Sequence, residues 1–166
     1  MPTTMVQAGA AFVPWASLDL DEKTRTQGTP SARLDDGEGW MIRTGSYDDA
    51  LGVEFVLQTT EHDETAAGSS LRTLAGYADL TQRFEIWDGP VSAWAGVGFG
   101  LGLMHFDWDG SYRSEVTGLW VGEGIFALQF GPHVSVETRI IGFSASHPGR
   151  SAGTGVLATI GGSIGF

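Results

Sequence analysis

Three residues that could carry out nucleophilic hydrolysis follow one another at alternate positions: His133, Ser135 and Glu137, in the segment HVSVE. A serine hydroxyl beside an imidazole base and a carboxylate is the arrangement that serine hydrolases use. Residues two apart in a β-strand point to the same side of the sheet, so these side chains would share one face. The spacing also fits polar side chains that simply pack against one another. Catalysis and packing are therefore competing hypotheses for this segment.

A second group of polar residues could form buried ion pairs. Each lies within a segment of alternating hydrophobicity, among Gly, Ser and Thr. A polar face that is so sparse and nearly balanced in charge suits the inside of a narrow closed barrel, because a charge removed from water needs an opposite partner. The predicted lumen charges are Arg43, Arg83 and Arg139 with Glu54, Asp79, Glu123 and Glu137.

Metal and cofactor chemistry has less support. Asp107 and Asp109 have the spacing of a calcium-binding loop, but no full set of oxygen ligands follows them. His105 is more typical of a polar rim than of a zinc ligand, and the chain has no cysteine. The formal net charge of −11 disfavours nucleic acid, whose phosphates would be repelled. We expect no cofactor, no metal and no nucleic-acid partner.

The elements that would position these residues are eight segments of alternating or apolar residues. None carries a capped apolar stripe with a period of 3.6, so no long helix is expected. The predicted strands are Met5–Asp19, Gly39–Tyr47, Leu51–Thr60, Leu71–Trp87, Val91–Phe106, Thr117–Phe130, His133–Ser144 and Gly153–Phe166.

The connections between these segments alternate regularly in length. The first, third, fifth and seventh are long and carry most of the excess acid, whereas the others are the short stretches DDA, DGP and GP. Transmembrane barrels have tight turns on one side, longer loops on the other, and both termini at the tight-turn end. The sequence therefore predicts an all-β fold: one domain over residues 1–166, an eight-stranded antiparallel up-and-down transmembrane barrel.

The sixth segment is ambiguous within this scheme. Leu119, Val121 and Ile125 lie on the same predicted face as Glu123 and Gln129. A β-bulge or a change of register in this segment would explain the mixture.

A soluble barrel would show the same alternation with its faces exchanged, so other features must decide. The polar face has few charges for a water-exposed surface. Aromatic residues also lie near segment ends, where membrane barrels carry interfacial belts: Trp15, Trp40, Trp87, Trp108, Phe130 and Phe166. The start of the chain lacks the pattern of a secretory signal. We expect a mature chain, without its signal peptide, in the bacterial outer membrane.

Two stretches resemble small eight-stranded outer-membrane barrels of the OmpA and opacity-protein class. VSAWAGVGFGLGLMHF resembles the glycine-rich fifth strand of that class, and GEGIFALQFGPHVSVETRIIGF resembles the hairpin that follows it. The ending GGSIGF resembles the C-terminal signal that the outer-membrane assembly machinery recognises, which here comprises Ile160, Ile164 and Phe166. No peptidoglycan-binding domain is expected, and the resemblance specifies a barrel class rather than a function.

The hydrolase hypothesis has its own resemblance, to eight-stranded lipid A deacylases that use a His-Ser-Glu set. In that reading Ser135 is the nucleophile and His133 the base. However, His133 follows a tight turn, at the opposite end from the outer leaflet where those enzymes act. RIIGFSAS resembles a second motif of the family, but Gly142 and Ala145 replace its histidine and asparagine. We therefore do not expect an enzyme, and keep a deacylase-like esterase as the second alternative.

The function expected from these observations is structural or one of surface interaction, with a lumen plugged by polar and charged side chains. The first alternative is a narrow channel, or a transporter of small or hydrophobic molecules similar to OmpW. Hydrophobic transport would require an apolar upper lumen, for which Trp94, Met104 and the sixth segment are candidates. Expected partners are outer-membrane lipid, lipopolysaccharide and the assembly machinery, and the chain is expected to be a monomer.

Overall fold

The computed structural model describes residues 3–19, 31–48, 50–64, 70–108, 115–146 and 152–166. Within these ranges the side chains at positions 3, 14–19, 31–36, 63–64, 108, 115 and 152 are not described. Most of the predicted long connections lie outside the described residues, as do Asp109 and the side chains of Trp15 and Trp108. None of the described residues forms a helix long and apolar enough to cross a membrane.

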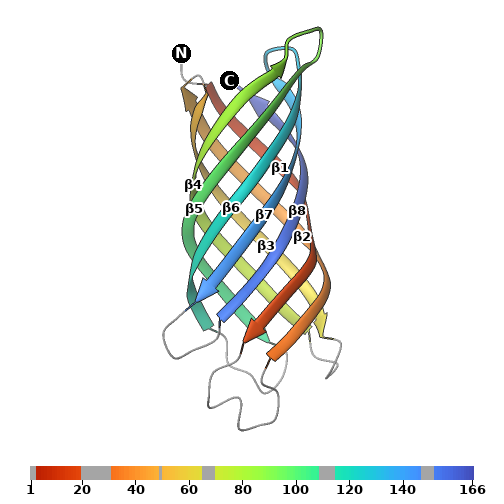
Figure 1. Ribbon diagram of the computed structural model, residues 1–166, viewed down its shortest axis with the longest axis vertical. Helices are drawn as coiled ribbons and strands as arrows, with labels where there is room; N and C mark the ends of the chain where they lie inside the picture. The colour runs from red at the N-terminus through yellow and green to blue at the C-terminus, as the bar shows by residue number, and fades with distance from the viewer. Residues whose placement is uncertain (1–2, 20–30, 49, 65–69, 109–114, 147–151) are drawn as a thin grey trace.

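The described residues form a closed barrel of eight antiparallel strands, each paired with its neighbours in the sequence (Figure 1). The first and last strands also pair, from Met5 opposite Gly165 to Asp19 opposite Ala152. The strands are β1 (Thr3–Asp19), β2 (Ser31–Asp48), β3 (Leu51–Glu64), β4 (Ser70–Trp87), β5 (Ser92–Trp108), β6 (Glu115–Phe130), β7 (Val134–Ser146) and β8 (Ala152–Gly165). The predicted fold class is confirmed.

Both termini lie at the end of the barrel that carries the short connections (Figure 1), which we call the tight-turn end. The other end is the loop end. The turn between β6 and β7 requires a backbone conformation that favours glycine, because Gly131 has a φ of 68°.

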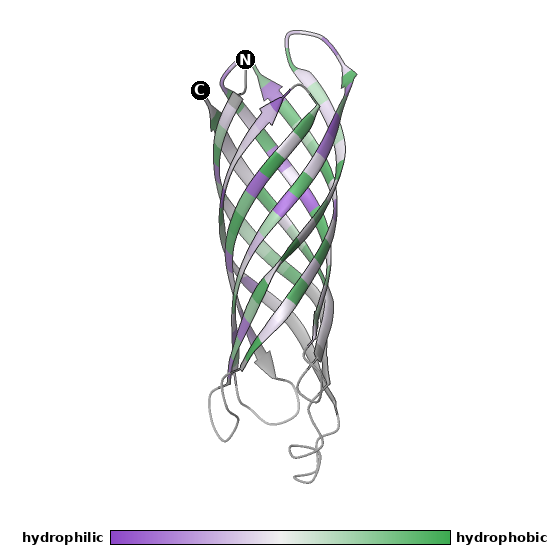
Figure 2. Cartoon of the chain, turned by 90° about the vertical axis from the view of Figure 1, so that its left-hand side faces the viewer, coloured by the Kyte–Doolittle hydropathy of each residue, from purple (hydrophilic) through white to green (hydrophobic). Residues whose placement is uncertain are grey.

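Buried and exposed residues alternate along most strands, so each strand has an inward and an outward face, and hydropathy changes from residue to residue along the strands (Figure 2). On β7, Val134, Val136 and Ile140 are 49%, 43% and 65% exposed, as an apolar outer band requires. The ends of this band also carry exposed aromatic residues, including Trp40 and Phe166, and Trp87 is exposed at the end of the projecting strand β4. Because every strand presents such residues outward, the described outer surface suits contact with lipid.

The structure corrects the predicted strand boundaries and irregularities. The strand predicted at Gly39 begins at Ser31, so the first long connection is shorter than expected. No register shift occurs in the pairing of β6 with β5 or β7, although one was expected there. Shifts occur instead between β2 and β3, from Leu34 to Gly37, between β4 and β5, from Glu85 to Trp87, and between β1 and β8, from Phe12 to Trp15. Pro14 lies within the last of these intervals and has no amide hydrogen for the ladder.

Candidate functional site

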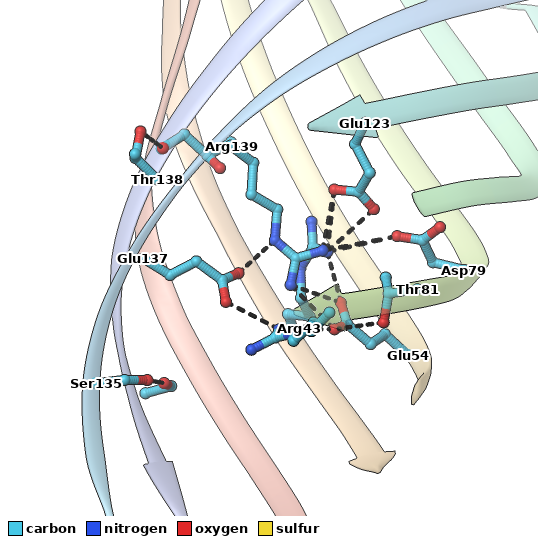
Figure 3. A network of polar contacts seen from close by, with 12 residues as sticks. Arg43, Glu54, Asp79, Thr81, Glu123, Ser135, Glu137, Thr138 and Arg139 are labelled. Atoms are coloured by element: carbon cyan, nitrogen blue, oxygen red, sulfur yellow. Dashed lines mark hydrogen bonds and ion pairs between the residues drawn. The ribbon is translucent and has the colours of Figure 1, made fainter. Parts of the chain in front are cut away.

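The seven predicted lumen charges come together across the barrel interior; Figure 3 labels six of them, and ion pairs with Glu54 and Glu137 add Arg83. We call the seven residues the charge network. The strand positions explain this convergence: Glu54 and Asp79 are direct cross-strand partners, and Glu123 faces Gly98 on the neighbouring strand. Their strands are β2 for Arg43, β3 for Glu54, β4 for Asp79 and Arg83, β6 for Glu123, and β7 for Glu137 and Arg139.

Arg43 holds one side of the charge network through a single guanidinium nitrogen. Its Nη1 atom lies 2.6 Å from Glu54 Oε2, 3.3 Å from Glu123 Oε2 and 3.5 Å from Asp79 Oδ2. All of these side chains are fully buried. Arg43 therefore ties β2 to β3, β4 and β6.

Arg139 holds the other side. Its Nη2 atom donates to Glu54 Oε1 at 3.0 Å, its Nη1 atom donates to Glu123 Oε2 at 3.0 Å, and its Nε atom donates to Glu137. Glu54 and Glu123 thus each lie between two arginines. Charge-assisted hydrogen bonds of this kind are stronger than neutral ones, which helps to offset the cost of burying the ions.

Arg83 closes the charge network toward the tight-turn end and is the one arginine of the three with some exposure, at 12% of its side chain. Its Nη2 atom lies 2.8 Å from Glu137 Oε2 and 3.1 Å from Glu54 Oε1. It also donates to the Tyr47 hydroxyl and lies 4.3 Å from the centre of the Tyr47 ring. Glu54 therefore contacts all three arginines.

The glycine run of β5 makes room for these side chains. A Cβ atom at Gly98 would lie 2.8 Å from Glu123 Cγ and 3.0 Å from Thr81 Cγ2. Its neighbour in the run, Gly100, faces Val121 and Tyr77 in the same way. The Gly-x-Gly pattern thus gives β5 a bare inner surface against which side chains from other strands pack.

Three carboxylates of the charge network, from Glu54, Asp79 and Glu123, have oxygen atoms within 4.8 Å of one another. Such a group could in principle hold a metal ion. Here Arg43 and Arg139 each contact all three side chains, so arginine charges already occupy the position that a cation would take. The observed arrangement is that of an ion-pair network.

Between the charge network and the loop end, apolar side chains pack in the lumen beside the buried polar residues Gln58, Thr60, His62, Thr73 and Thr117. Leu71, Ile141 and Leu157 are at most 1% exposed there. We call this cluster the apolar plug; it comprises Ala11, Val13, Val56, Leu71, Ala75, Tyr77, Met104, Phe106, Leu119, Val121, Ile141, Ala145 and Leu157. This arrangement explains why the inner face of β6 mixes apolar and charged residues. The strand contributes Leu119 and Val121 to the apolar plug and Glu123 to the charge network.

A small cavity of about 180 Å³ lies on the other side of the charge network, at the tight-turn end. Tyr47, Arg83, Trp94, Gln129, Ser135 and Ser163 are among the residues that line it. Trp94, a candidate for the apolar upper lumen, thus lies at the opposite end, because β5 begins at the tight-turn end. Met104 does lie in the apolar plug.

The three candidate hydrolase residues make separate contacts. His133 is exposed in the turn before β7, with Nδ1 3.1 Å from the Gly165 carbonyl oxygen. Ser135 shares a hydrogen bond with the Ser163 hydroxyl, and Glu137 pairs with Arg83 and Arg139. None of the side-chain hydrogen bonds found among the described residues joins His133, Ser135 and Glu137 into a nucleophile and base.

The C-terminal residues close the barrel. Ile160, Ile164 and Phe166 point outward and are 52%, 55% and 74% exposed. The Phe166 amide donates to the Thr4 carbonyl oxygen at 2.8 Å, and the Thr4 amide donates back to the Phe166 carbonyl oxygen at 3.3 Å. The chain end is therefore bonded to the first strand.

Sequence reasoning missed the uncharged partners of the charge network. Tyr47 contacts Arg83, and the Thr81 hydroxyl lies 3.4 Å from Glu54 Oε1. A signal was available for both. Tyr47 is in phase with Arg43 along β2, and Thr81 lies between Asp79 and Arg83 on the inner face of β4.

No protein family matches the chain, and no curated protein matches it. Solved structures do match. Neisserial surface protein A (NspA) is 17% identical, with a TM-score of 0.63 over 98% of this chain and 97% of that chain. The outer membrane protein OprG from Pseudomonas aeruginosa is 15% identical, with a TM-score of 0.66 over 99% and 95%. Ail, the attachment invasion locus protein of Yersinia pestis, is 13% identical, with a TM-score of 0.55 over 99% and 98%. The chain therefore has the eight-stranded closed fold of small outer-membrane barrels.

Proposed function

We propose that this protein is a monomeric bacterial outer-membrane barrel with a structural or surface-interaction role, and that its lumen is sealed. The observation that carries the proposal is the double closure of the lumen. The charge network fills the middle of the barrel with side chains from five strands, and the apolar plug fills the part next to the loops. Eight strands enclose an interior just wide enough for side chains to fill, so a continuous water channel is not expected.

The role at the cell surface belongs to the loop end in this proposal. Ail is described as an attachment invasion protein and has been solved with a heparin analogue, sucrose octasulfate. A polyanion of that kind is a poor ligand for this chain, whose formal net charge is −11. We infer that its surface contacts favour cationic partners, or lipopolysaccharide bridged by divalent cations. In this proposal the outer-membrane assembly machinery recognises the outward C-terminal residues Ile160, Ile164 and Phe166.

The proposal is tested on the protein folded in detergent and then in planar bilayers. Unboiled protein should migrate as a compact β-rich band that boiling converts to a slower one, and bilayers should show no single-channel events. A protein that stays soluble without detergent and gives no compact band contradicts the membrane assignment. Regular channel openings of the unaltered protein contradict the sealed lumen while leaving the membrane assignment intact.

A second candidate function is transport of small hydrophobic molecules. The apolar plug supplies the apolar upper lumen that this function needs, and a groove of about 400 Å³ lies in the barrel wall beside it. Phe99 and Trp120 line the groove from the outer face, whereas the inward residues Val121 and Phe143 reach it from the lumen side. Gly122 and Gly142, which are cross-strand partners, leave the outer surface without side chains at this point.

Filling the groove from the lipid side tests this candidate. A Cβ atom at Gly122 meets nothing within 4 Å, so Gly122→Leu should fold normally and cover the groove. Gly162→Leu is the matched control, because Gly162 is equally open but does not line the groove. If transport occurs, uptake of a hydrophobic dye into vesicles should fall several-fold in Gly122→Leu alone. Equal uptake by both variants and by vesicles without protein would remove transport as a candidate.

A further inference from the structure

One hairpin of the barrel extends beyond its neighbour and leaves a free strand edge. β3 begins at Leu51, which is paired with Gln82 of β4, whereas β4 continues to Trp87. On its other side β4 remains paired with β5 as far as Trp87 opposite Ala93. The hairpin projects past the neighbouring strands at the tight-turn end (Figure 1). Among the described residues, the segment Arg83–Trp87, which we call the β4 edge, therefore has a strand on one side only.

One hydrogen bond shows in which direction the backbone amide and carbonyl groups of the β4 edge point. The Arg83 amide donates toward the missing strand, to the Ala50 carbonyl oxygen at 2.7 Å. Backbone groups of a strand alternate in direction, so the amide and carbonyl of Glu85 point to the same side as those of Arg83. No described residue forms a strand beside Glu85 there. Other strands at this end are paired at or near their last residue, as with Asp48 opposite Leu51 and Phe130 opposite Val134.

An unpaired edge of this kind cannot lie in the hydrocarbon of a membrane, because its amide and carbonyl groups would have no partners. In water it is a template for an added strand. The register of β4 against β5 shifts between Glu85 and Trp87, so the regular alternation of the β4 edge extends only from Arg83 to Glu85. Phe84 and Ile86 are exposed apolar residues at 51% and 57%, and Glu85 lies between them.

The charge around the β4 edge is negative. Asp48, Glu85 and Asp88 are exposed near it. Arg83, the described basic residue of this segment, forms ion pairs with Glu54 and Glu137, so its charge is already balanced inside the barrel. A second copy of the chain pairing edge to edge would bring the acidic groups of both copies together, which is unfavourable. A basic strand would instead meet complementary charge.

We propose that the β4 edge binds an extended, basic and apolar segment of a periplasmic protein by strand addition. The periplasmic location rests on the proposed function; the strand addition itself rests only on the geometry and charge of the edge. Main-chain hydrogen bonds to Glu85 fix the register of the added strand, and Phe84 and Ile86 provide apolar contact. The carboxylates of Asp48, Glu85 and Asp88 favour basic side chains. This surface shares only Arg83 with the charge network, and it lies at the opposite end of the barrel from the loop end.

The test uses the full chain folded in detergent micelles and a labelled peptide of four Lys-Val repeats with blocked ends. Fluorescence anisotropy should show saturable binding of one peptide per barrel. Glu85→Pro should weaken binding at least tenfold, because proline removes the free amide while the bonds from β4 to β5 are kept. Glu85→Gln, which keeps the amide, should weaken binding only by the loss of one charge. Heat-modifiable migration of both variants verifies that the barrel is folded.

A second peptide separates strand addition from simple charge attraction. The same repeat with N-methylated valines has equal charge but lacks those amide donors, and it should bind at least tenfold more weakly. Equal binding of the two peptides, or equal binding to unaltered protein and Glu85→Pro, would overturn the proposal. Self-association that ultracentrifugation detects and that Glu85→Pro abolishes would overturn it in favour of a second copy as the partner. Failure of the peptide to bind a correctly folded barrel overturns strand addition and leaves the outer-membrane assignment standing.

Discussion

The charge network and the apolar plug close the same lumen in two different ways. The charge network does so with ions from five strands, each held by opposite charges at hydrogen-bond distance. The apolar plug does so with hydrophobic side chains that need only to exclude water and fit one another. The difference shows where each closure is vulnerable. An ion pair fails when one partner is lost, whereas apolar packing weakens in proportion to the volume removed.

The two regions also differ in how they hold the barrel together. Glu54 alone contacts arginines from three strands, so the charge network makes distant strands depend on one another. The apolar plug instead packs side chains from β1 and from β3 to β8 by apolar contact, without ion pairs. Four experiments test this contrast, from the largest expected change in the free energy of unfolding to the smallest.

The largest effect is expected from Glu54→Ala. Removing this carboxylate leaves three arginine side chains with less compensation inside the barrel, and breaking a buried pair costs about 3–5 kcal/mol. Urea unfolding in lipid vesicles measures the change. Glu38→Ala, which removes an exposed outward carboxylate, is the control and should stay within about 0.5 kcal/mol of the unaltered protein. Similar losses in both variants would contradict the idea of Glu54 as a hub.

Leu71→Ala tests the apolar plug. Leu71 is fully buried, and removing a buried leucine side chain costs about 2–5 kcal/mol through lost burial and the cavity left behind. The matched control is Leu74→Ala on the same strand, because Leu74 points outward and is 46% exposed. A loss in the control as large as in Leu71→Ala would mean that the upper lumen is not packed. Vesicle unfolding at two salt concentrations should give the same loss for Leu71→Ala, since no charge is involved.

The contrast between the two regions also explains what the sequence could predict. Charges such as Arg43 and Glu54 stand out at alternate positions between apolar neighbours, so their strands, phase and inward direction can be read directly. The alternation of long and short connections then predicts that each strand pairs with its neighbours in the sequence. Individual contacts could not be read, because the pairing of Arg43 with Glu123 depends on how strands far apart in the sequence face one another across the lumen.

The sequence indicated the apolar plug only through Met104 and the sixth segment, and its full extent was hidden for the opposite reason. On β6, Leu119 and Val121 point into an apolar lumen while Trp120 points outward, so both faces are hydrophobic and the alternation disappears. The expected bulge was a misinterpretation of this pattern. A strand that is apolar on both faces in an otherwise alternating barrel instead indicates an apolar lumen at that level.

A double substitution tests whether part of the charge network can be made apolar. Arg83 and Glu137 contact each other at 2.8 Å, so Arg83→Met and Glu137→Leu should each destabilise the barrel. Together they should cost less than the sum, with a coupling energy of about 0.5–3 kcal/mol. A four-point cycle of vesicle unfolding experiments measures this term. Strict additivity would mean that the two side chains stabilise the barrel independently, despite their contact.

The smallest effect is expected where an ion pair lies outside the lumen. Arg72 Nη2 is 3.5 Å from Glu61 Oε2 on the outward face, and the two side chains are 64% and 55% exposed. Exposed pairs contribute about 0.2–1 kcal/mol, because water already solvates both charges. Arg72→Gln should therefore change the unfolding free energy by no more than that. The change should vanish in 1 M salt, where charges are screened beyond about 3 Å. The loss in Glu54→Ala should persist under the same conditions, because its partners are buried away from the salt. A salt-sensitive Glu54→Ala would show that ions reach the lumen, and would make the charge network a permeable gate rather than a seal.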